Sequence, residues 1–185
     1  MKVVAATFLL VVFLTTHLHA HAQDGGKKEF GGLTLGVGLS LTHDLGKSDR
    51  VTSASIVNGV VRVAGERNDV TRIMLESHYF FTPKKDFFLN SNVKENEWGW
   101  GPFVAVQAGS NEIVEAIAFG VMWGFRRNKT DSSSWNIGLG AVVDPSVKVL
   151  GDGFVPNAAP PTGETEVRFK EKSQWGLLII SSFSF

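Results

Sequence analysis

The sequence predicts an all-β fold, an antiparallel up-and-down β-barrel of about eight strands that follows a cleavable signal peptide. Three observations predict this class. Large apolar and small residues alternate along most of the chain, charged side chains gather in the connections between alternating runs, and the first 22 residues have the layout of a targeting segment.

The first 22 residues combine a charged start, an apolar run and a cleavage motif. Lys2 precedes the apolar run 3–14, and Ala20-His21-Ala22 stands before Gln23. This is the arrangement of a secretory signal, and the run is shorter than the roughly 20 residues that a membrane-spanning helix needs. We therefore expect residues 1–22 to be a signal peptide and residues 23–185 to form one barrel domain.

The charge balance and the cysteine count exclude several classes of function. Lys and Arg together number 18 and Asp and Glu also number 18, so the chain lacks the basic excess of a nucleic-acid-binding protein. The chain has no cysteine, which excludes a disulfide framework, a zinc site built on Cys and a thiol nucleophile. No nucleic-acid partner is expected.

Alternation with a period of two residues marks the strands. Within residues 33–41, every odd position is Leu or Val, while the even positions are Thr34, Gly36, Gly38 and Ser40. The same pattern recurs at 135–143 and 175–185. The predicted strands are residues 30–42, 51–57, 60–64, 70–81, 98–109, 113–126, 135–148 and 173–185.

The connections carry turn and loop signals. Asn58-Gly59 lies between two β-branched runs and predicts a two-residue hairpin with a type I′ turn, and Ser110-Asn111 is a second hairpin candidate. Residues 151–163 contain three prolines and predict a long loop, because proline is excluded from central strands. Residues 82–96 predict another long connection.

The small-residue face of these strands favours a barrel in a membrane over a soluble one. A strand face that meets water normally carries Lys, Glu, Thr and Arg, whereas here it carries residues such as Gly36, Ser40 and Gly138. A barrel that spans a membrane turns its apolar face to lipid and its other face to the interior. We therefore expect large apolar residues to point outward and glycine and serine to line the interior.

Aromatic residues are predicted to form a girdle at one membrane interface. If the strands alternate in direction, nine aromatic residues fall at the same end of the barrel, where their rings gain most from the boundary between acyl chains and headgroups. The predicted girdle is Tyr79, Phe81, Trp98, Trp100, Trp123, Phe125, Trp135, Phe183 and Phe185. Trp175 alone marks the opposite rim.

The last strand resembles the C-terminal strand of bacterial outer-membrane β-barrels. Leu177, Ile179, Phe183 and Phe185 share one face of that strand. In length and architecture the chain is similar to the small eight-stranded barrels of the OmpA and OmpX type. The resemblance implies location in the cell outer membrane, contact with outer-membrane lipid, and recognition by the barrel-assembly machinery through the strand that ends at Phe185. The long connection at 82–96 departs from the short periplasmic turns of that class.

One segment carries the residues with the most reactive side chains. Glu76 and His78 are two positions apart on a predicted strand and share its inward face, whereas Ser77 points to the opposite face. The pair is a candidate catalytic His with an orienting carboxylate, and its nucleophile would have to come from another strand, for example Ser40 or Ser182. The alternative is a buried polar network that fills the interior, made of Glu76, His78, Gln107, Arg126, Asn136 and Asp144.

No metal or cofactor is expected. His17, His19 and His21 belong to the predicted signal peptide, and the remaining histidines, His43 and His78, fall on separate strands. The favoured function is a monomeric, non-enzymatic outer-membrane barrel that acts in envelope structure, adhesion or small-partner binding through its outer loops, because eight strands enclose an interior that side chains fill. The alternatives are a lipid-modifying hydrolase that uses His78 and Glu76, and a secreted soluble β-barrel that binds an apolar ligand.

Overall fold

The structure is a computed structural model that describes residues 30–46, 50–90, 92–109 and 114–185. The predicted signal peptide and the predicted turn at Ser110-Asn111 lie outside these residues. The described part of the chain is all-β, with eight antiparallel strands and no helix. The strands are β1 (Gly32–Asp44), β2 (Arg50–Val57), β3 (Val60–Arg67), β4 (Asp69–Phe80), β5 (Trp98–Gln107), β6 (Ala116–Phe125), β7 (Ser134–Leu150) and β8 (Phe169–Ser184).

Six of the eight strands pair in a cycle. The order of pairing is β1, β4, β5, β6, β7 and β8, and β8 returns to β1. We call this six-stranded ring the barrel. β2 and β3 pair only with each other in a separate two-stranded sheet, so the prediction that all eight strands enter one up-and-down barrel was wrong.

The pairing of β1 with β4 explains why β2 and β3 stay outside the barrel. β1 and β4 match at consecutive positions from the Gly32/Phe80 pair to the His43/Asp69 pair. Both strands carry exposed apolar residues at odd positions, so this register keeps one face of the pair uniformly apolar. β2 and β3 are eight residues each and lack such a face, because their outward and inward positions are not consistently apolar and polar.

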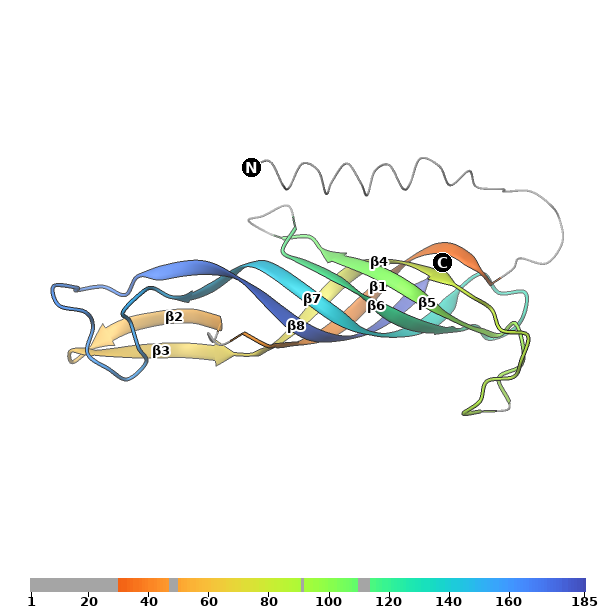
Figure 1. Cartoon of the computed structure of the whole chain (residues 1–185), viewed down its shortest axis with the longest axis horizontal. Helices are drawn as coiled ribbons and strands as arrows, with labels where there is room; N and C mark the ends of the chain where they lie inside the picture. Colours follow the sequence, from red (N-terminus) through yellow and green to blue (C-terminus); the bar gives the residue numbers. More distant parts are fainter. Residues whose placement is uncertain (1–29, 47–49, 91, 110–113) are drawn as a thin grey trace.

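The strands outside the barrel form an arm at one end of the molecule (Figure 1). The arm comprises β2, β3, the parts of β7 and β8 that continue past the barrel, and the loop 151–168. Asn58 and Gly59 have φ values of 52° and 73°, as the predicted type I′ turn requires. The loop contains no strand, as predicted, and its Ala158 carbonyl accepts a hydrogen bond of 2.9 Å from the Val61 N–H.

The arm has a small apolar core of its own. It is formed by buried side chains from β2, β3, β7 and the loop, namely Val51, Val61, Val147, Val149 and Phe154. β8 begins at Phe169, earlier than predicted, because its first residues pair with β7 from Val147 to Leu150 beyond the barrel. The arm is therefore a packed unit rather than a set of loose loops.

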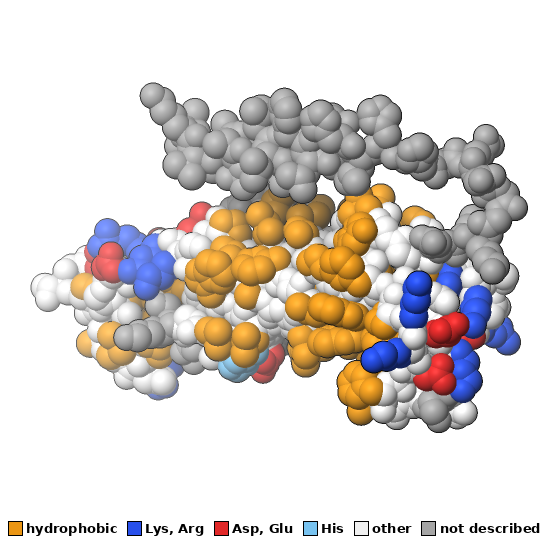
Figure 2. All heavy atoms as spheres, turned by 45° about the vertical axis from the view of Figure 1, so that its right-hand side comes forward, with side chains coloured by type: hydrophobic (Ala, Val, Ile, Leu, Met, Phe, Trp, Pro, Cys, Tyr) orange, Lys and Arg blue, Asp and Glu red, His pale blue; other side chains and the backbone are white. Residues whose placement is uncertain are grey.

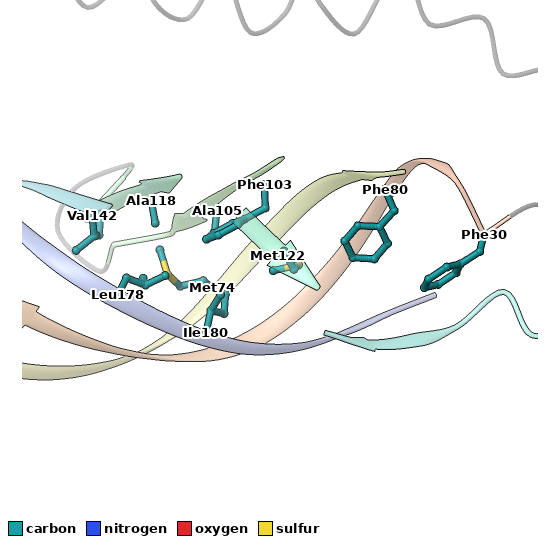
Figure 3. Packing of buried hydrophobic residues seen from close by; sticks show 11 residues of the cluster. Phe30, Met74, Phe80, Phe103, Ala105, Ala118, Met122, Val142, Leu178 and Ile180 are labelled. Atoms are coloured by element: carbon teal, nitrogen blue, oxygen red, sulfur yellow. The ribbon is translucent and has the colours of Figure 1, made fainter. Parts of the chain in front are cut away.

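Apolar side chains fill the middle of the barrel (Figure 3). Met74, Phe103, Met122 and Ile180 are fully buried there. The expectation that glycine and serine line the interior is thus only partly met. In the run 177–180, Leu177 and Ile179 face outward while Leu178 and Ile180 face inward, so the apolar residues of β8 serve both faces.

Glycines on the inward face make room for these large side chains. A Cβ atom added at Gly124 would lie 2.1 Å from the Phe80 ring, and one added at Gly138 would lie 2.7 Å from Ile180. At Gly36 the added atom would lie 2.2 Å from the carboxylate of Glu76. The inward glycines are therefore the positions opposite large or charged side chains, and the interior is packed rather than open.

Candidate functional site

A cluster of polar side chains lies inside the barrel around Glu76. The Nδ1 atom of His78 lies 2.8 Å from Glu76 Oε2, and the Ser182 hydroxyl donates a hydrogen bond of 2.9 Å to Glu76 Oε1. The Asn136 amide donates to Glu76 Oε1 at 3.5 Å and to the Ser182 hydroxyl at 3.2 Å. Ser134 extends this inner cluster, because its hydroxyl donates to Asn136 Oδ1 at 2.6 Å.

Two properties of the strands bring these groups together: the alternation of inward and outward side chains along each strand, and the register between neighbouring strands. Glu76 and His78 are two positions apart on β4, so both point inward, as the sequence predicted. Asn136 on β7 lies opposite Ser182 on β8 in the ladder between these strands. Gly36, on β1, lies opposite Glu76 of β4. Because Gly36 has no side chain, the carboxylate of Glu76 occupies the space beside it.

The hydrogen bonds of the inner cluster satisfy the buried carboxylate of Glu76 and do not activate a serine as a nucleophile. In a hydrolytic triad the base histidine lies between the nucleophile and the acid. Here Glu76 lies between Ser182 and His78, so the serine hydroxyl donates to the carboxylate and not to the imidazole. Ser40, the other nucleophile considered from the sequence, hydrogen-bonds to the Arg72 carbonyl at 3.4 Å.

A second polar cluster lies where the barrel meets the arm. We call Asp44, Arg50, Arg72 and Asp144 the junction cluster. Arg50 and Arg72 each approach Asp144 Oδ2, at 2.8 Å and 3.0 Å, and Arg50 also lies 3.1 Å from Asp44 Oδ2. Arg72, Asp44 and Asp144 are buried, so two cations and two anions neutralise one another away from water.

The sequence predicts Asp144 as part of a polar network but does not give its two ion-pair partners, Arg50 and Arg72. Arg72 stands at an even position of β4, as Glu76 and His78 do, so alternation alone predicts that it points inward. Nothing local marks Arg50, because it contacts Asp144 on a strand far away in the sequence, and Asp44 joins the cluster through its own contact with Arg50. Met74, which stands between Arg72 and Glu76 on β4, belongs to the apolar cluster in the barrel interior (Figure 3).

The structure does not bring Gln107 and Arg126 into either cluster. Gln107, the last residue of β5, hydrogen-bonds to Glu115. Arg126 follows β6, and its guanidinium lies 4.8 Å from the centre of the Phe30 ring and donates to the Asp131 carbonyl at 3.3 Å. Both residues stand at strand ends, where the side chain is no longer directed into the interior by the ladder.

A crevice of about 490 Å³ opens beside the inner cluster, near the first residues of β1 and the end of β8. Leu33, Leu35 and Phe185, which are exposed, line its outer part, and the buried His78 and Ser184 line its inner part. The crevice therefore connects an apolar outer surface with the polar interior.

Most of the predicted aromatic girdle lies on the outer surface at one end of the barrel. Tyr79 and Phe81 have ring centres 5.3 Å apart, and Phe81 and Trp100 have ring centres 5.7 Å apart. Trp98 is an exception, because it is buried and its indole N–H donates to the Lys85 carbonyl at 2.8 Å. The exposed members are Tyr79, Phe81, Trp100, Trp135, Phe183 and Phe185, and the half-buried members are Trp123 and Phe125.

The outer surface of the barrel carries an apolar belt. Between the aromatic end and Trp175, the described outward positions of the six strands carry one acidic side chain, Asp69, whose carboxylate lies 2.8 Å from the imidazole of His43. His43 lies opposite Leu177 in the ladder, so this pair stands at the edge of the belt towards the arm. Figure 2 shows hydrophobic side chains gathered over the middle of the molecule, with charged side chains towards its two ends. The belt comprises Leu33, Leu35, Val37, Leu39, Leu41, Ile73, Leu75, Tyr79, Phe81, Trp100, Val104, Val106, Ile117, Phe119, Val121, Trp135, Leu139, Trp175, Leu177, Ile179, Phe183 and Phe185.

A scan against protein-family models, a search of curated proteins and a search of solved structures found no match to this chain. Within the described ranges, no helix is long and apolar enough to cross a membrane. In the same part of the chain, no three His, Asp or Glu side chains gather as a metal site would require.

Proposed function

We propose that this protein is a non-enzymatic outer-membrane β-barrel that presents the arm at the outer surface, for a role in envelope structure, adhesion or binding of a small partner. The observation that carries the proposal is the inverted polarity of the barrel. Its buried ionisable groups, such as Glu76, Arg72 and Asp144, lie inside, while its exposed outer face is apolar apart from one hydrogen-bonded pair, His43 and Asp69, at the edge towards the arm. Water would penalise such a surface, whereas lipid favours it.

The height of the belt supports a bilayer as its environment. The ten steps from Trp175 to Phe185 rise about 33 Å along a strand at about 3.3 Å per residue. A strand tilt of about 45° reduces this to about 23 Å, close to the apolar band of about 25 Å in outer-membrane barrels. Trp175 and the aromatic girdle then lie near the two interfaces.

We place the aromatic girdle at the periplasmic interface and the arm outside. The strand that ends at Phe185 resembles the C-terminal strand read by the barrel-assembly machinery, so that machinery and outer-membrane lipid are the proposed partners, with the protein as a monomer. The arm lies at the opposite end of the barrel from Phe30 and the C-terminus (Figures 1 and 3).

Two alternatives have weaker support. A hydrolase that uses His78 and Glu76 would need a nucleophile on the imidazole, and the Ser182 hydroxyl instead donates to Glu76. A soluble carrier of an apolar ligand would need an open interior, which side chains such as Phe103 and Met122 occupy. We propose a structural role for the inner cluster.

Cell fractionation tests the proposed location. We expect the protein in the outer-membrane fraction, released only by detergent, and migrating differently on gels with and without heating because the folded barrel resists unfolding. Recovery in the periplasmic fraction without detergent would contradict the proposal and favour the soluble alternative.

Leu39→Arg tests whether the belt faces lipid. Leu39 is 57% exposed in the middle of the belt, and Leu45 is 58% exposed beyond β1, where its N–H donates to the Trp175 carbonyl. In lipid vesicles, Leu39→Arg is expected to lower the free energy of unfolding by about 2–4 kcal/mol, and Leu45→Arg by about 0–1 kcal/mol, because the cost of a charge depends on depth. Denaturant titration followed by tryptophan fluorescence measures both. Equal effects of the two substitutions would argue against a bilayer around the belt.

A further inference from the structure

The connection between β4 and β5 exposes two large apolar side chains outside the barrel strands. Phe88 is 76% exposed and Leu89 is 75% exposed, and they are adjacent in sequence. We call residues 82–96 the girdle loop. Contiguous apolar side chains at such exposure indicate a contact surface rather than a water-facing turn.

Ring contacts and backbone hydrogen bonds fix the described residues of the girdle loop next to this pair. The Phe87 ring packs edge-on against Trp98 and Phe125, with ring centres 4.9 Å and 5.0 Å apart. The Phe87 N–H donates to the Val93 carbonyl at 2.9 Å, and Asn90 N–H donates to the Phe87 carbonyl at 3.1 Å. The Phe88 ring lies 4.9 Å from the Phe87 ring between centres, and both Phe88 and Leu89 remain largely exposed while Phe87 packs onto the barrel end.

Charged groups of the loop are arranged around the apolar pair. The Lys94 ammonium lies 3.1 Å from Asp86 Oδ2, and this hydrogen bond holds the pKa of Asp86 below its usual value. Glu97 Oε2 accepts a hydrogen bond of 2.9 Å from the Lys94 N–H. Lys84 and Lys85 are exposed just before the apolar pair, so cations flank it on one side.

The loop lies beside the barrel end rather than along the barrel axis. In Figure 1 the yellow-green segment between β4 and β5 extends sideways from the end of the barrel that carries the C-terminus. Its contact with Phe125 joins it to the aromatic girdle, because Phe125 lies 6.2 Å from Trp135 between ring centres. If the belt lies in lipid, the loop overhangs the surrounding bilayer at the level of the interface.

We propose that the girdle loop is an interfacial anchor whose Phe88 and Leu89 enter the boundary between acyl chains and headgroups of the inner leaflet. Lys84 and Lys85 remain at headgroup level, where their ammonium groups meet lipid phosphate. The partner is the bilayer itself. The inference rests on the proposed function, since it requires the barrel to span a membrane.

Depth-dependent fluorescence quenching tests the anchor, and the absence of native cysteine makes labelling specific. Leu89→Cys, Glu95→Cys and Leu177→Cys would each be labelled with a small environment-sensitive dye in vesicles of phosphatidylethanolamine and phosphatidylglycerol. Glu95 is an exposed position of the same loop and Leu177 is a belt position, so they are the matched controls. Heat-modifiable migration confirms that each variant is folded.

We expect lipid that carries a quencher near the headgroup to quench the dye at position 89 about twofold more than the dye at position 95. The dye at position 177 should be quenched by lipid that carries its quencher deeper in the acyl chain. Quenching at 177 without quenching at 89, or equal quenching at 89 and 95, would overturn the anchor and leave the barrel proposal standing. No quenching at any position would overturn both.

Discussion

Glu76→Ala is expected to lower the free energy of unfolding by about 3–5 kcal/mol, the cost of breaking a buried, hydrogen-bonded pair by removing one partner. The substitution leaves His78, Ser182 and Asn136 without the carboxylate that they contact. It also empties the space that Gly36 provides beside β4. Denaturant titration of the folded protein, followed through the fluorescence of its tryptophans, measures the loss.

Three further variants identify the cause of that loss. Glu76→Gln retains an acceptor for Ser182 and removes only the charge, so its effect should be smaller than that of alanine. Replacing Glu76 and His78 together by leucine should cost less than the two single substitutions combined, because no charge is then left unpaired. Glu95→Ala, at an exposed site, should leave unfolding unchanged. A similar small effect of Glu76→Ala would show that the inner cluster does not stabilise the barrel.

The order and the faces of the strands were predictable because alternation is a local property. Large apolar residues take most of the outward positions of each barrel strand, with small polar residues such as Ser77 and Ser181 among them. The turn at Asn58-Gly59 is specified by two neighbouring residues. The identity of the paired strands was not predictable in the same way. β1 pairs with β4 across the intervening hairpin, and that choice depends on matching faces between residues that are 26 to 48 positions apart.

The prediction that glycine and serine line the interior was only partly met, because each strand was interpreted as having one apolar face. A six-stranded ring has little room for water, so its middle is filled by Met74, Met122 and Ile180 as well as by small residues. In β8 this appears as the continuous apolar run 177–180, whose successive residues point to opposite faces, so both faces of the strand are apolar there.

The candidate site was predictable only within one strand. The shared face of Glu76 and His78 follows from their spacing, and Ser77 lies on the other face. The contacts of Glu76 with Ser182 and Asn136 depend on the width of the ring and on the register between β7 and β8. Neither the width nor the register can be deduced from neighbouring residues in the sequence. The sequence therefore could not predict that Ser182 contacts the carboxylate of Glu76 and not the imidazole of His78.

The junction cluster leads to a second large effect, at Asp144. Asp144→Ala is expected to lower the free energy of unfolding by about 3–5 kcal/mol, because the buried Arg72 and the half-buried Arg50 lose the carboxylate they share. The other carboxylate oxygen, Oδ1, accepts a hydrogen bond of 3.2 Å from Ser146 N–H, inside the register shift between Asp144 and Val147. The same denaturant titration measures the loss.

The position of Asp144 also predicts which part of the protein is destabilised by Asp144→Ala. Arg50 begins β2 and connects it to β1 and β7 through Asp44 and Asp144, so losing Asp144 weakens the attachment of the arm. Hydrogen–deuterium exchange should therefore rise in β2 and β3 while β5 and β6 remain protected. Asp152→Ala removes an exposed carboxylate paired with Lys170 in the arm and should change neither measurement. Uniform loss of protection in Asp144→Ala would mean that the cluster supports the barrel as a whole and does not specifically fasten the arm to it.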